Sequence, residues 1–105
     1  EFRLKILAED FRAAGTAVLD SLAEYAKEQP GWSIAPDNCE GVRVNLDKAH
    51  GDGWFLLRLS LHDPILPLNI ESDREHGART IARELAPFLA QQTEIDASSA
   101  LEFTL

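Results

Sequence analysis

Residues 53–72 have the sequence GWFLLRLSLHDPILPLNIES, and this stretch decides the fold. Residues 54–60 are the most apolar run of the chain, and along 64–71 Leu66, Leu68 and Ile70 recur at every second position, so both runs are typical of β-strands. The short segment between the two runs predicts a connection that joins neighbouring strands. Pro67 lies inside the second run, and a proline donates no hydrogen bond to a neighbouring strand. We therefore expect this second strand at an edge of the sheet or at a bulge.

Working outward, alternation predicts further strands at about 2–7 and 41–46. The first residues also fit a helical stripe that starts at Leu4, but we favour the strand. A helical pattern over about 10–28 begins at Asp10, a good N-cap, and stops at Pro30-Gly31. The sequence predicts a strand and a long helix for this part of the chain.

The sequence Ser-Asp-Arg-Glu at 72–75 is a capping box, which predicts that a second helix starts there. Beyond about residue 93 the chain is polar and shows no pattern. We therefore expect residues 1–93 to form one domain and residues 94–105 a loose C-terminal tail.

This order of elements predicts an α+β fold, an antiparallel sheet of about four strands with two helices packed on one face. In the strand at 54–60, Trp54 and Leu56 make the second face apolar as well. Two helices cover only one face of a sheet. The second face is then covered by a companion domain, serves as a binding surface, or has ordinary local cover.

Composition excludes several classes of function. The formal net charge of the 105 residues is −8, which disfavours nucleic-acid binding, and no apolar run approaches the roughly 20 residues that cross a membrane. Cys39 is the only cysteine, which excludes an internal disulfide and indicates a loop residue in a cytoplasmic protein. No export leader is visible. The chain has no Met and begins at Glu1, so we expect a piece of a longer protein.

Acidic and histidine side chains recur, but their spacing matches no metal-ligand pattern. We interpret those of the 47–53 segment as turn residues and expect no metal site in this chain. The side chains considered are Asp47, His50, Asp52, His62 and Asp63.

A more specific candidate site lies between the two central runs. Arg58 and Ser60 share one face of their strand, because strand side chains repeat every two residues, and His62 and Asp63 follow in the turn. A guanidinium, a hydroxyl, an imidazole and loop amides together suit a phosphate group. The alternative is that Arg58 pairs with a neighbouring carboxylate such as Asp63 and the loop is only a connection. The residues alone favour that alternative.

The sequence Glu-Gly-Val-Arg-Val at 40–44, the segment 53–60, Pro64 and the strand that ends at Glu71 together resemble the C-terminal domain of the phosphohexomutases. This family includes phosphoglucomutases, phosphomannomutases and phosphoglucosamine mutases. The resemblance covers about residues 40–91, and 1–39 match only in layout. It implies the TATA-box-binding-protein-like α+β fold of those domains.

The resemblance also implies a phosphate-binding loop made of Arg58, Ser60, Leu61, His62 and Asp63, which holds the phosphate already on the sugar. Leu61 stands where the family has Asn or Gly and offers only its backbone amide. His62 replaces a Thr and supplies an imidazole donor, and Asp63 stands where Glu or Thr is common.

In such isomerases (intramolecular phosphotransferases of carbohydrate metabolism) the phosphoserine, the aspartates that hold Mg²⁺ and the sugar-recognition loop lie in three preceding domains. The resemblance therefore implies that this chain holds no catalytic residue and is not an enzyme alone. Its implied partners are a hexose 1- or 6-phosphate and the upstream domains of the same polypeptide, with no nucleic acid and no membrane.

Two other hypotheses stay open. The chain is a stand-alone regulatory or protein-binding module that uses the Trp54 and Leu56 face, or it binds RNA through that face. Its net charge and the lack of an aromatic and basic stripe count against RNA.

Overall fold

The computed structural model describes residues 1–36 and 41–105, so the expectation for Cys39 falls outside the described residues. Among the described residues, no helix has both the length and the apolar composition needed to cross a bilayer. The elements in chain order are β1 (Phe2–Ile6), α1 (Phe11–Lys27), β2 (Trp32–Ile34), β3 (Gly41–Leu46), the short 3-10 helix η1 (Lys48–His50), β4 (Gly53–Arg58), β5 (Ile65–Ser72), α2 (Gly77–Ala90), β6 (Ile95–Asp96) and α3 (Ser98–Phe103).

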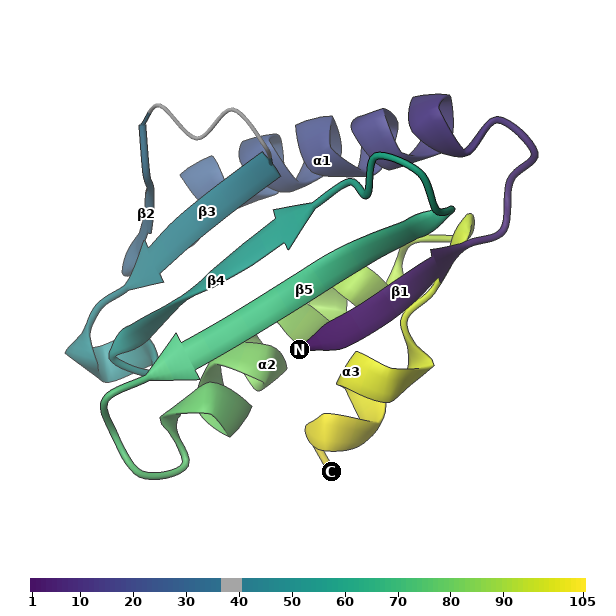
Figure 1. The fold of residues 1–105 in the computed structure, drawn as a ribbon. Coiled ribbons are helices and arrows are strands. Elements are labelled where there is room, and N and C mark those ends of the chain that lie inside the picture. The colour runs from purple at the N-terminus through teal and green to yellow at the C-terminus, as the bar shows by residue number, and fades with distance from the viewer. Residues whose placement is uncertain (37–40) are drawn as a thin grey trace.

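The described strands form one antiparallel sheet in the order β2-β3-β4-β5-β1-β6. Figure 1 shows the sheet from its helix-free face, with α1 and α2 behind it. The predicted α+β class and the antiparallel sheet with helices packed on it are confirmed. The sheet has six strands rather than about four. The two edge strands, β2 and β6, have only three and two residues, too few to show alternation in the sequence.

The core lies between the sheet and its two long helices. Phe55 and Leu57 of β4 are fully buried on the helix side, as are Leu22 of α1 and Leu85 of α2. Burying a side chain of this size contributes about 1.5–3 kcal/mol. The strand that carries the candidate site is therefore anchored by its neighbours on the opposite face.

Pro67 does not lie on an edge strand, because β5 pairs with β4 on one side and with β1 on the other. The N–H of Ser60 donates to the carbonyl of Ile65 at 3.1 Å, so odd-numbered residues of β5 turn their main chain toward β4. The continuous register with β4 ends at Leu57 and Leu68, next to Pro67, and the Ser60–Ile65 hydrogen bond lies on the other side of the proline. The missing donor therefore leaves a local gap between β4 and β5, and the pairs on both sides of this gap hold the central strand.

The capping-box prediction is wrong. Ser72 is the last residue of β5, and its hydroxyl donates to the carbonyl of Gly51 and accepts from the N–H of Arg74. α2 begins later, at Gly77, after His76 in a left-handed conformation with φ 62°. The hydroxyl that the motif assigns to a helix end instead holds the connection between β5 and α2.

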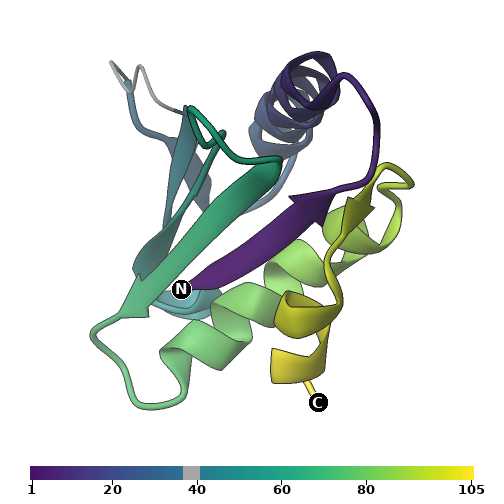
Figure 2. The same ribbon diagram turned by 45° about the vertical axis from the view of Figure 1, so that its right-hand side comes forward.

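The C-terminal residues also differ from the loose tail expected over 94–105. β6 pairs with β1, and α3 lies beside β1 and α2, as Figure 2 shows. Ala97 and Ala100 are buried, and the rings of Phe2 and Phe103 lie 5.3 Å apart. A two-residue strand and a six-residue helix are too short to leave a periodic signal in the sequence.

Candidate functional site

The loop 59–64 joins β4 to β5 at the end of the sheet that lies beside the first turn of α1 (Figures 1 and 2). Its first residue, Leu59, packs against the core on the helix side. An added Cβ at Gly15 of α1 would lie 2.6 Å from Cδ1 of Leu59. The glycine lets the Leu59 side chain pack closely against α1 at the base of the loop.

Arg58 and Ser60 lie on the helix-free face. Leu57 is fully buried on the helix side, so the side chain of Arg58 points the other way. Ser60 keeps the alternation, because its N–H still pairs with Ile65 across the ladder. Within residues 1–36 and 41–105, no hydrogen bond or ion pair engages the Arg58 guanidinium, and Asp63 does not pair with it. A guanidinium and a hydroxyl thus stand side by side where β4 ends.

The two ends of the loop are held by hydrogen bonds of the main chain. The N–H of Asp63 donates to Oγ of Ser60 at 3.4 Å, and the N–H of Ile65 donates to the carbonyl of Asp63 at 2.8 Å. From β1, the N–H of Ile6 donates to the carbonyl of Pro64 at 2.7 Å. These contacts fix the path of the loop and leave only its tip unconstrained by the strands.

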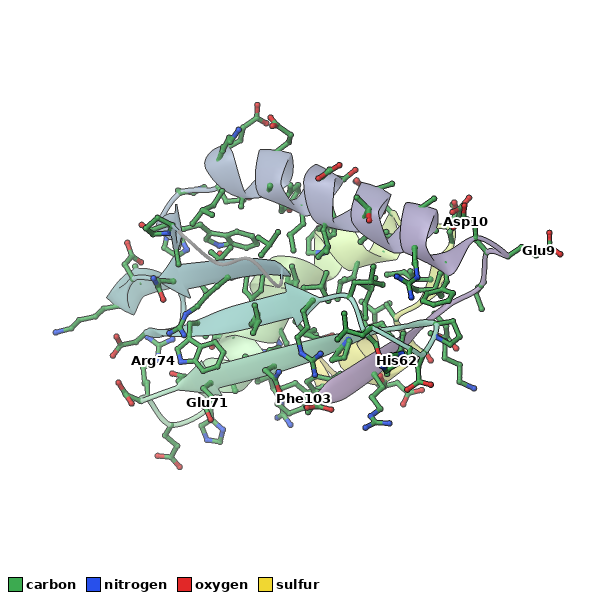
Figure 3. The ribbon with its side chains drawn as sticks, turned by 45° about the horizontal axis from the view of Figure 1, so that its top comes forward. Glu9, Asp10, His62, Glu71, Arg74 and Phe103 are labelled. Carbon is green, nitrogen blue, oxygen red and sulfur yellow. The ribbon has the colours of Figure 1, made fainter. Side chains whose placement is uncertain are left out.

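The tip itself presents unmatched donors. In the described part of the chain, the N–H groups of Leu61 and His62 have no acceptor, and both residues are exposed. Among the described residues, no hydrogen bond or ion pair joins the imidazole of His62 to the carboxylate of Asp63. Figure 3 shows His62 far along the sheet from Glu71 and Arg74.

Sequence analysis missed one residue of this site. A guanidinium nitrogen (Nη2) of Arg12, in the first turn of α1, donates to the carbonyl of Leu61 at 3.0 Å. The two residues are 49 positions apart, and an arginine on the exposed side of a helix gives no signal of such a contact. The loop tip therefore has a second guanidinium beside it, on the side of the helices.

The helix-free face carries cationic and acidic side chains: Arg3 lies 3.6 Å from Glu1, Lys5 stands opposite Asp96, and Glu71 stands opposite Trp54. The Arg43 guanidinium lies over the ring of Trp54 at 4.3 Å, and Trp54 and Leu56 are half-buried. The sequence left three alternatives for this apolar face: a companion domain, a binding surface or local cover. The chain itself shows local cover, because the long Arg43 side chain lies over Trp54. Four of the ten Lys and Arg residues lie on this face, namely Arg3, Lys5, Arg43 and Arg58.

A hollow of about 470 Å³ lies at the opposite end of β4 and β5. The carboxylates of Glu71 and Asp73 stand at its wall, and negative charge there disfavours a phosphate. The hollow is lined by Gly53, Trp54, Ile70, Glu71, Ser72, Asp73 and Ala78.

The histidine and aspartate of the 47–53 segment hold a turn together. Asp47 accepts from the N–H of Ala49, and Nδ1 of His50 lies 3.2 Å from Oε1 of Glu84. Over residues 1–36 and 41–105, no three His, Cys, Asp or Glu side chains come together in a way that fits a metal ion.

No protein-family model matches the chain. The chain is similar to part of a probable phosphoglucosamine mutase from Methanopyrus kandleri, with 34% identity over 58 residues. The match covers 55% of this chain and 12% of the mutase, so the chain corresponds to a small part of that protein. Part of the chain is thus similar to part of a phosphohexomutase-type isomerase.

Proposed function

We propose that this chain is the substrate-phosphate-binding domain of a phosphohexomutase-type isomerase, and that residues 58–63 bind the phosphate of a hexose phosphate. The observation that carries the proposal is the arrangement at the end of β4. Arg58 and Ser60 share the helix-free face, beside a loop tip whose Leu61 and His62 amides have no acceptor in the described chain. The partial similarity to a probable phosphoglucosamine mutase supports it.

The donors at this end match the chemistry of a phosphate monoester, which carries a charge of about −1.5 to −2 at neutral pH. The Arg58 guanidinium can meet two phosphate oxygens at once, and the Ser60 hydroxyl and free amides supply neutral donors. The imidazole of His62 adds a further donor. Asp63 contributes through its main chain, which closes the turn with Ser60 and Ile65.

The proposal assigns positioning rather than bond-making to this chain. The loop offers an anion the Arg58 guanidinium, the Ser60 hydroxyl and the amides of Leu61 and His62. In the longer enzyme, the phosphoserine and the Mg²⁺ ligands belong to upstream domains. This domain closes over the cleft and anchors the distal phosphate while a phosphoryl group passes between the 1- and 6-positions of the sugar. We therefore expect no mutase turnover from the 105-residue chain alone, and turnover in a coupled assay would contradict this division of labour.

The binding claim is tested by NMR titration of the ¹⁵N-labelled chain with glucose 6-phosphate and glucosamine 6-phosphate, with unphosphorylated glucose as the ligand control. We expect the amides of Ser60, Leu61 and His62 to shift with both phosphates and not with glucose. Arg58→Ala should abolish these shifts. Arg43→Ala removes a cation from the same face and should leave them in place, which separates a placed guanidinium from general positive charge.

A second candidate function rests on the helix-free face around Trp54 and Leu56. Arg43 and Arg58 flank these half-buried side chains and can attract carboxylates of a partner, which suits a stand-alone protein-binding or regulatory module with no catalytic role. If a partner protein shifts the amides of Trp54 and Leu56 while sugar phosphates leave Ser60, Leu61 and His62 unchanged, this second candidate replaces the first.

A further inference from the structure

We propose that Arg12 is a positioning residue, which turns the Leu61–His62 peptide so that the His62 N–H points at the bound phosphate. This inference rests on the proposed function, because it concerns the geometry of the same loop. The contact that carries it is the hydrogen bond from the Arg12 guanidinium to the carbonyl of Leu61.

Arg12 itself is held in place by its helix. Asp10 caps the start of α1 by accepting the N–H of Ala13 at 3.1 Å, and Gly15 packs against Leu59 at the base of the loop. The first turn of α1 is thus held beside the loop by contacts other than that of the guanidinium. Because of this, a donor on α1 can set the orientation of a peptide on the loop.

The orientation follows from the planarity of the peptide bond. In a trans peptide the carbonyl of one residue and the N–H of the next point in opposite directions, and no cis peptide bond occurs in the described chain. The Leu61 carbonyl points to Arg12 on α1, so the His62 N–H points away from α1. The helices cover the face opposite to Arg58 and Ser60, so this N–H is directed away from the helix layer and toward the side where those two residues stand.

Little else in the described chain holds this peptide. Neither Leu61 nor His62 makes another hydrogen bond there, and 73% of the Leu61 residue surface is exposed. Without Arg12 the peptide plane is free to rotate, and the His62 N–H spends only part of its time directed at the phosphate. Losing one ordered donor to a charged ligand weakens binding by about tenfold.

The test compares three variants of the 105-residue chain, using inorganic phosphate and glucose 6-phosphate as probes. Arg12→Ala should weaken binding about tenfold and abolish the downfield shift of the His62 amide proton at saturation. Arg12→Lys, which keeps a cationic donor, should recover part of both effects. Arg74→Ala is the matched control, because that guanidinium also donates to a distant carbonyl, Lys48, and its loss removes the same charge.

The outcomes separate this inference from the proposed function. If the wild-type chain binds neither probe, the proposed function and this inference fall together. If the wild type binds and Arg12→Ala binds equally well, only this inference is overturned. It is also overturned if Arg12→Ala binds weakly but keeps the wild-type His62 shift at saturation, since Arg12 then contacts the phosphate itself. Equal melting temperatures of the variants show that the fold is unaffected.

Discussion

The two ends of β4 and β5 use similar polar groups in opposite ways. At the end where β5 leads into α2, the Ser72 hydroxyl is bonded to the main chain of Gly51 and Arg74, and the guanidinium of Arg74 donates to Lys48 at 2.7 Å. At the other end, the amides of Leu61 and His62 have no acceptor among the described residues. We call the end at Ser72 the closed end and the end at Leu61 and His62 the open end. The polar groups of the closed end bind the protein itself, whereas the open end has donors left for a ligand.

The closed end includes a network that joins three elements. Oε1 of Glu84, on α2, accepts from the indole nitrogen of Trp32 at 3.0 Å and lies 3.2 Å from Nδ1 of His50. The open end has no comparable network in the described chain. The two ends therefore differ in how far their polar groups are used by the fold itself.

The largest effect on stability should come from a substitution in the core of β4, the strand that joins the two ends. Leu57→Ala in β4 removes a fully buried side chain and should lower the free energy of unfolding by about 2–5 kcal/mol. In urea unfolding, the fluorescence of Trp32 and Trp54, both near the closed end, and the His62 amide at the open end should report the same midpoint. Two separate midpoints would show that the ends do not belong to one cooperative unit.

A change in the closed end should reduce stability and leave binding intact. Glu84→Ala leaves the Trp32 indole and the His50 ring without their acceptor and should cost about 1–3 kcal/mol in urea unfolding. The folded variant should bind glucose 6-phosphate as the wild type does. Glu75→Ala, an exposed carboxylate on the connection to α2, is the control and should change neither quantity.

A substitution in the open end should weaken phosphate binding and leave stability almost unchanged. Ser60→Ala should alter the free energy of unfolding by no more than about 0.5 kcal/mol, because its hydroxyl accepts only one long hydrogen bond. It should weaken phosphate binding, as measured by isothermal titration calorimetry. A large loss of stability with unchanged binding would place Ser60 among the structural residues instead.

The smallest effect concerns α3, outside both ends. Hydrogen bonds from the hydroxyl and the main-chain N–H of Ser98 lower the pKa of Asp96 below its ordinary value of 3.8. A lowered folded-state pKa stabilises the protein above pH 3.8, and this contribution is lost as the pH falls further through the folded value. Thermal unfolding at pH 7 and pH 3 should show a smaller difference in Asp96→Asn than in the wild type. An equal difference would show that Asp96 does not contribute to the pH dependence of stability.

Periodicity was sufficient for the long elements and for the α+β class, because each of those elements repeats a pattern several times. It failed at β6 and α3, which are too short to show a period, and at Pro67, which a central strand accommodates through a local gap in its pairing with β4. The capping box failed because the Ser72 hydroxyl binds residues 51 and 52, a contact that no local pattern reveals.

In the candidate site, too, local patterns predicted some features, while others depend on contacts between distant residues. Strand alternation predicted that Arg58 and Ser60 share a face, and the structure places them so. Arg12 could not be predicted, because its contact with Leu61 joins residues far apart in the sequence. That residues 58–63 bind phosphate stays a prediction.

A crystal structure of the chain soaked with glucose 6-phosphate tests the central claim most directly. We expect the phosphate within hydrogen-bond distance of the Arg58 guanidinium, the Ser60 hydroxyl and the His62 N–H. A phosphate in the hollow beside Glu71, or Arg58 bound to a carboxylate of this chain with no ligand at the loop, would contradict it.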